Sequence, residues 1–242
     1  MKKISKQFIG ILFIAALFTS CSIDIFNRVN GNRNVLVKER KPQDDFSGIT
    51  VSTGIDVFIS QGNTNSITVE ADENLHDIII TEVNNGVLKI YSDKNIWKAK
   101  ARKVHVTLEN LTLLKATSGS DVHSETIITT NEISITATSG ADINIEIDAQ
   151  SIATSATSGA DIKVYGTAIN HASNATSGSA IDAHNLKSEN VIVKVTSGAD
   201  VQIYASKKIE AKATSGGAID FRGNPGIINR KTTSGGSISK NQ

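Results

Sequence analysis

The feature that most constrains this chain is the tripeptide Thr-Ser-Gly, which recurs at a nearly constant interval. Seven copies occur after residue 116, with steps of 21, 19, 19, 20, 18 and 19 residues. Three copies extend to the same pentapeptide, Thr-Ser-Gly-Ala-Asp. A period held this closely indicates a repeat architecture in which each unit packs on its neighbours. The copies begin at Thr117, Thr138, Thr157, Thr176, Thr196, Thr214 and Thr233.

Apolar residues alternate with polar ones on both sides of each copy. Ile133 and Ile135 precede one Thr-Ser-Gly, and Ile143, Ile145 and Ile147 follow it. This period of two is that of half-buried strands, and no unit contains a helical period. A unit of about 19 residues cannot bury its apolar face alone, but stacked coils about 4.8 Å apart can. We therefore predict an all-β fold, a single-stranded parallel β-helix, and the variation in period favours a right-handed one.

The composition agrees with this architecture. Hydrophobic residues make up 39% of the 242 residues and aromatic residues 5%, so the core must consist of Ile, Val, Leu and Ala. The segment 46–91 also reads as short strands joined by tight turns, one of them at Asn85-Gly86. We expect a β-helix domain over 44–242, with its regular repeats in 104–239.

The N-terminus has the pattern of a secretion signal followed by a single cysteine. Residues 1–20 combine a basic start with a short apolar run, and Cys21 is the only cysteine of the chain. This arrangement resembles the lipobox of bacterial lipoproteins, although Phe18 stands where Leu is usual. The alternatives are an uncleaved anchor or an incidental cysteine. We expect a lipoprotein signal peptide in 1–20, lipidation of Cys21 and a tether in 21–43.

Charge gives little indication of a partner. Removal of residues 1–20 would leave 22 basic and 24 acidic residues, a net charge near −2 without histidine. Such a balance argues against nucleic acid as the partner. We expect a protein of the cell envelope, held to the bacterial outer membrane by lipid on Cys21 and facing either the periplasm or the outside.

The repeated tripeptide is explained most simply as a corner between two strands. Glycine accepts positive φ, and the Thr and Ser hydroxyls can bond backbone groups that a corner leaves unpaired. The small residue after each glycine would fit the inside of the bend. We expect turn-forming roles for Gly119, Gly140, Gly159, Gly178, Gly198, Gly216 and Gly235.

Four copies carry an aspartate two residues after the glycine. The alternation directs this position outward, into water. Stacked carboxylates repel one another unless they are solvated, hydrogen-bonded or bridged by a cation. We favour solvated or structural aspartates, with a Ca²⁺-type cation row and a catalytic role as alternatives. The four are Asp121, Asp142, Asp161 and Asp200, and Asp56 follows Gly54 by the same rule.

A basic stretch surrounds the only tryptophan. Residues 94–103 contain five Lys or Arg side chains around Trp97. The functional interpretation is a patch for an anionic polymer. We favour a solvated loop that Trp97 anchors.

Together these features resemble a known family. The residues that carry the resemblance are the N-terminal pattern 46–57, the turn at 85–88 and the Thr-Ser-Gly coils. They are similar to the putative auto-transporter adhesin head domain, a domain of formerly unknown function common in lipoproteins of Bacteroidetes. The resemblance covers 46–239. It implies a single-stranded parallel β-helix on an envelope anchor and no catalytic residues.

We therefore predict a non-catalytic envelope lipoprotein that acts as an adhesin-like or structural β-helix. We expect no cofactor, and a glycan or envelope protein is a possible ligand. The alternative is a polysaccharide lyase or hydrolase, since a base could come from the basic residues of the coils. A third hypothesis is self-association by stacking of β-helix ends. The basic residues considered for the enzyme alternative are Lys163, Lys194, Lys212, Arg222 and Arg230.

Overall fold

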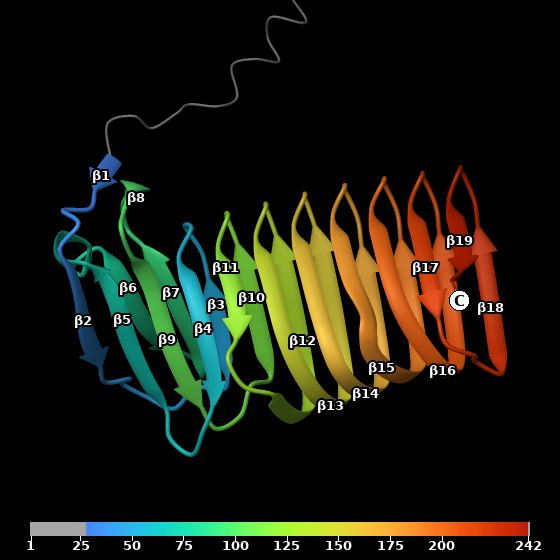
Figure 1. Cartoon of the computed structure of the whole chain (residues 1–242), viewed down its shortest axis with the longest axis horizontal. Coiled ribbons are helices and arrows are strands. Elements are labelled where there is room, and N and C mark those ends of the chain that lie inside the picture. The colour runs from blue at the N-terminus through green and yellow to red at the C-terminus, as the bar shows by residue number, and fades with distance from the viewer. Residues whose placement is uncertain (1–27, 242) are drawn as a thin grey trace, which may run out of the picture.

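The computed structural model describes residues 28–241, which form a β-solenoid of about seven turns (Figure 1). Coils about 19 residues long stack in parallel, as the repeat predicts. The Cys21 and signal-peptide predictions lie outside the described residues. Of the segment expected to be a tether, residues 28–40 carry two strands. The regular coils comprise β10 (Leu113–Thr117), β11 (Asp121–Ser124), β12 (Ile128–Thr138), β13 (Asp142–Thr157), β14 (Asp161–Ala175), β15 (Ala180–Val195), β16 (Asp200–Ala213), β17 (Ala218–Arg222), β18 (Ile227–Thr232) and β19 (Ser237–Lys240).

Each regular coil has two sides joined by one sharp corner and one gentle bend. Strands β13 to β16 run without interruption from one corner to the next, so the return that completes each coil is strand as well. The first part of each strand joins one sheet, which continues through β11, β17 and β19. The second part joins the facing sheet, which continues through β10, β12 and β18. The corners form a row along one edge of the solenoid (Figure 1).

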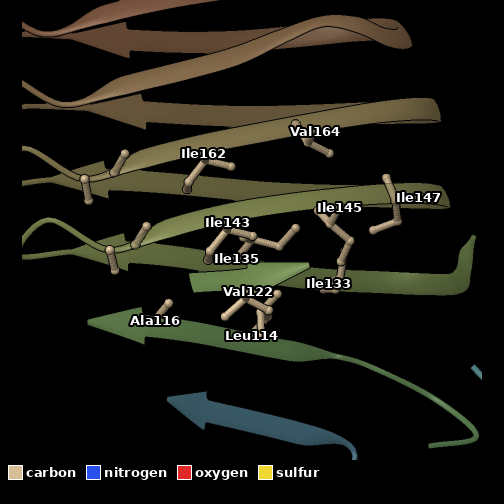
Figure 2. Packing of buried hydrophobic residues seen from close by; sticks show 14 of the residues in the cluster. Leu114, Ala116, Val122, Ile133, Ile135, Ile143, Ile145, Ile147, Ile162 and Val164 are labelled. Atoms are coloured by element: carbon tan, nitrogen blue, oxygen red, sulfur yellow. The ribbon is translucent and has the colours of Figure 1, made fainter. Parts of the chain in front are cut away.

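The core fills the space between these two sheets. Ile143, Ile145 and Ile147 point into the interior, as Figure 2 shows, and each is at most 2% exposed. Because the strands are parallel, equivalent residues of successive coils stack on one another. Val122, Ile143 and Ile162 thus form one column of aliphatic side chains. The alternation in the sequence therefore gives a continuous apolar interior, which stabilises coils that could not fold singly.

The N-terminal part closes the solenoid with antiparallel strands. Strand β5 pairs antiparallel with both β2 and β9, and β6 pairs antiparallel with β7. Asn85 and Gly86 both have positive φ at the β6–β7 turn, as this hairpin requires. The elements are β1 (Arg28–Asn30), β2 (Val35–Arg40), β3 (Gly48–Val51), β4 (Asp56–Gln61), β5 (Ser66–Asp72), the 3₁₀ turn η2 (Glu73–Leu75), β6 (Ile79–Asn84), β7 (Val87–Ser92), β8 (Asn95–Lys98) and β9 (Arg102–Leu108).

A buried carboxylate holds this closed end together. Asp72 is 0% exposed, and its carboxylate accepts hydrogen bonds from the backbone N–H groups of Arg33, Lys100 and Ala101 at 3.0 to 3.2 Å. Removal from water raises the pKa of Asp72, but these three donors outweigh that effect and the pKa is lowered overall. The carboxylate thus joins the loop after β1 to the loop before β9.

Candidate binding surfaces

The corners have one conformation throughout. Every Ser of the seven copies has φ between +50° and +57°, and every Gly has φ between +67° and +76°. Two successive positive φ values define a type I′ turn, and the Ala141 N–H accordingly donates to the Thr138 carbonyl at 3.3 Å. Thr53 and Gly54 adopt the same pair of values, so an eighth corner lies upstream. The sequence indicated the glycine conformation but not the strained serine.

Hydrogen bonds within the corners differ from those expected. The N–H of each corner glycine from Gly119 to Gly216 donates to the serine carbonyl of the next coil at 3.1 to 3.2 Å, so stacking satisfies the backbone. Most Thr hydroxyls instead lie 3.4 to 3.5 Å from the neighbouring Ser hydroxyl. Ser179, which follows Gly178, does bond the backbone as expected. Its hydroxyl lies 2.8 Å from the Ala156 carbonyl oxygen and 2.9 Å from the Thr176 carbonyl oxygen. The hydroxyls of the Thr-Ser pairs therefore face solvent along the edge.

The aspartates form an outward column, as the alternation predicts. We call this set the aspartate column. Asp56 and Asp142 both pair in register with Asp121, and Asp161 follows Asp142. The column consists of Asp56, Asp121, Asp142, Asp161, Ala180, Asp200, Ala218 and Ser237.

Neighbouring carboxylates in this column repel one another when they are charged. Partial burial and the neighbouring Asp121 and Asp161 carboxylates raise the pKa of Asp142. Partial burial also raises the pKa of Asp56; Arg102 opposes this effect and Asp121 adds to it. Within residues 28–241, no group of three or more His, Cys, Asp or Glu side chains is placed to hold a metal ion. The cation row stays a prediction.

Beside the aspartate column lies an aromatic stack that sequence reasoning missed. The Phe58 ring lies between His105 and His123, with ring centroids 5.1 and 5.8 Å away. His105 also approaches Glu70 at 3.7 Å and Glu125 at 4.0 Å. Three strands, β9, β4 and β11, present these rings in register. The sequence contains a signal for this stack, because Phe58 and His123 both stand two residues after an aspartate of the column.

The facing sheet carries a different set of columns on its outside. The position two residues before each corner threonine forms what we call the lysine column: Lys115, Thr136, Ser155, Asn174, Lys194, Lys212 and Lys231. Next to it, the threonines that begin the corners form the threonine column. From the sequence, Lys194 and Lys212 were considered as possible bases or as solubilising side chains. The constant offset before Thr-Ser-Gly would have shown that they share a column.

The remaining sequence candidates are dispersed. Lys163 lies on the aspartate side in β14, and the guanidinium of Arg230 lies 4.6 Å from the Phe221 ring. Trp97 does not anchor its loop, since it is 54% exposed, with Arg28 stacked on it at 4.0 Å, while Ile96 is buried.

Within 28–241, none of the helical segments has the length and apolarity needed to cross a bilayer.

The fold and these columns define a single-stranded parallel β-solenoid whose repeated chemistry lies on its outer faces. The chain belongs to the family described as putative auto-transporter adhesin, head GIN domain, which matches residues 45–225. This confirms the resemblance seen in the sequence. Among curated proteins, no sequence matches this chain.

Solved structures share the same fold. A putative adhesin from Bacteroides fragilis superposes with a TM-score of 0.82 at 21% identity, over 88% of this chain and all of that one. A putative lipid binding protein from Parabacteroides distasonis has a TM-score of 0.74 at 22% identity, over 89% and 100%. A putative adhesin from Parabacteroides merdae has a TM-score of 0.71 at 19% identity, with the same coverage.

Proposed function

We propose that this chain is a non-catalytic binding protein of the bacterial cell envelope, an adhesin-like β-solenoid held to the outer membrane by lipid on Cys21. The observation that carries the proposal is the set of in-register polar columns on both outer faces. A column presents an equivalent outward position of each coil at intervals of about 4.8 Å along the solenoid. Such a surface suits an extended ligand that makes many weak contacts.

The family description and the names of the structural neighbours support this proposal. The family and two of the three neighbours are described as adhesins, which suggests a cell-surface or envelope location. The third neighbour is described as a lipid binding protein. Of the described histidines, His105 and His123 share one column on either side of Phe58, whereas His76 lies in the N-terminal cap and His171 in the core.

A binding screen tests the proposal. The chain from Ser22 onward keeps every residue that the structure describes, and we would apply it to arrayed bacterial, plant and host glycans and to envelope extracts. We expect saturable binding to at least one extended ligand and no released fragments by mass spectrometry. Products that disappear in Asp142→Ala and Asp161→Ala variants would instead support the alternative, a polysaccharide-degrading enzyme.

Anchoring is tested separately in cells. We expect the full chain to label with a radioactive fatty acid and to fractionate with the outer membrane. A Cys21→Ala variant should lose the label and leave the membrane fraction. Unchanged fractionation of that variant would contradict the lipid anchor.

A further inference from the structure

Three lysines of the lysine column lie on successive coils in one line. Lys194 pairs in register with Lys212, and Lys212 with Lys231. All three side chains are exposed. Neighbouring strands place their Cα atoms about 4.8 Å apart, so three positive charges lie within about 10 Å along the axis. Like charges this close are unfavourable without an anionic partner, because each raises the potential at the others.

The described part of the chain supplies no such partner. None of the ion pairs within residues 28–241 includes Lys194, Lys212 or Lys231. Glu210 is the nearest acidic position along the strand, and it is paired with Lys208 at 2.7 Å. The three ammonium groups therefore remain available to a ligand.

The surroundings are shaped for a chain rather than for a compact molecule. A hollow of about 400 Å³ covers this part of the sheet, and its lining includes all three lysines, Ile192, Asn229 and Glu210, whose carboxylate is paired with Lys208. Beyond Lys194 the column continues as Asn174, Ser155 and Thr136, which are small and polar. The threonine column runs beside it over the same coils. The result is a strip with cations at one end and hydroxyl and amide groups along the rest.

We propose that this strip binds a linear anionic polysaccharide, with the polymer running parallel to the solenoid axis. A pyranose residue is about as long as the rise of one coil, so successive carboxylate or sulfate groups can meet successive lysines. The sugar hydroxyls would then meet Asn174, Ser155 and the threonine column. The aspartate column lies on the facing sheet and would repel such a polymer, which restricts binding to one side.

A membrane surface fits these observations less well. A bilayer presents anionic groups over an area and rewards apolar side chains that insert into it. Here the cations form a line, and the large exposed apolar residue that lines the same hollow is Ile192, at 49% exposed. We therefore infer a polymer, and this assignment rests on the proposed binding function.

The test compares two variants with the same change in net charge. One carries Lys194→Gln, Lys212→Gln and Lys231→Gln. The control carries Lys38→Gln, Lys94→Gln and Lys98→Gln, three exposed lysines near the other end. The probes are size-fractionated polygalacturonate, dextran sulfate, neutral dextran, and vesicles of mixed phosphatidylcholine and phosphatidylglycerol. Affinity is measured by calorimetry at two salt concentrations, and circular dichroism checks the fold.

We expect the unaltered chain to bind both polyanions, more weakly at high salt and more tightly as the polymer lengthens. The column variant should lose about 10- to 100-fold in affinity, because three exposed charge contacts are removed. The control should stay within about twofold. Equal losses in both variants, no binding to either polyanion, or binding to vesicles alone would overturn the assignment. Retained binding of a neutral glycan by the column variant would leave the broader proposed function standing.

Discussion

His171 occupies an interior position that neighbouring coils give to aliphatic side chains. It lies in register between Ile152 and Val191 and is 2% exposed. Its Nε2 lies 2.9 Å from the Thr154 hydroxyl, which donates to Ser173, while Nδ1 has no partner. Burial lowers the pKa of His171 to about 4, so the imidazole is neutral in the folded protein.

Stability should therefore fall as the pH falls through the window between 6.5 and about 4. The unfolded chain takes up a proton on His171 in this window and the folded chain does not, which costs about 3 kcal/mol by its lower end. His171→Ile should remove this slope and add about 1 to 2 kcal/mol at pH 7, because the unpaired Nδ1 is gone. Urea unfolding at several pH values measures both effects, with His123→Gln as a surface control. Parallel pH profiles for the variant and the unaltered protein would contradict a buried neutral imidazole.

Asp142 should show the opposite pH dependence. Its folded pKa is raised, so protonation on acidification relieves repulsion and adds stability between the folded pKa and 3.8. Asp142→Asn should raise the unfolding free energy at pH 7 by a few tenths of a kcal/mol, since the site is largely exposed. This gain should vanish below pH 3.8. Asp200→Asn is the matched control, because its column neighbours are Ala180 and Ala218. An equal gain in both variants would rule out repulsion within the column as the cause.

At the scale of the element, the sequence allowed most of the solenoid to be predicted. Position 143 and its equivalents alternate with polar residues, and Thr-Ser-Gly marks each corner, so strand, corner and period follow from local rules. The pairing of β2 with β5 did not follow, because it joins residues 27 to 37 positions apart without any repeat. The hydrogen bonds of Asp72 and those that join His171, Thr154 and Ser173 could not be predicted either, because they depend on which segments meet in the fold.

Two glycines show what steric exclusion adds to conformational strain, because Gly140 has positive φ alone and Gly166 combines φ +115° with a clash. Gly140 has φ +68° with no atom within 4 Å of an added Cβ, so Gly140→Ala should cost about 1 to 2 kcal/mol. Gly166 lies in a bend where a Cβ would fall 2.0 Å from the Ile147 carbonyl oxygen. Gly166→Ala should therefore cost more than about 4 kcal/mol or prevent folding. Urea unfolding of the two variants is the measurement, and similar costs would show that the bend can relax.

The N-terminal cap should depend on one carboxylate. Asp72→Ala leaves three backbone N–H groups without their acceptor and should cost about 3 kcal/mol. Hydrogen exchange should then accelerate at Arg33 and Ala101 before it does so in β13 and β14. The lowered pKa of Asp72 implies that its contribution is present above pH 3.8 and is lost as the pH falls further. Uniform acceleration over the whole chain would contradict a local role.

At the scale of the molecule, the two ends differ. The N-terminal end is covered by antiparallel strands, η2 and the buried Leu75. Both ends have strands with a single partner, β2 and β6 at the N-terminal end and β18 and β19 in the last described coil, but the pairs are antiparallel at the first end and parallel at the second. Ile227 and Ile228 are 54% and 41% exposed there, while Arg230 stacks on Phe221.

This asymmetry leads us to expect dimers rather than filaments. Two copies can join by the edges of β18 and β19, while Lys38, Glu39 and Arg40 on the edge of β2 disfavour the same pairing at the other end and so limit further growth. Light scattering should show a concentration-dependent dimer, which a double Ile227→Lys and Ile228→Lys variant weakens. Lys38→Gln at the other end should have no effect. A strict monomer at high concentration would contradict end-to-end association.

The constant register between coils has an evolutionary consequence. Each coil of β13 to β16 runs from one Thr-Ser-Gly corner to the next and pairs with the coils beside it. An in-frame duplication or loss of one such unit would keep both faces, the interior columns and the cap, and would change only the length. Natural variation can therefore lengthen or shorten the ligand-facing strip by whole coils without redesigning any contact within it.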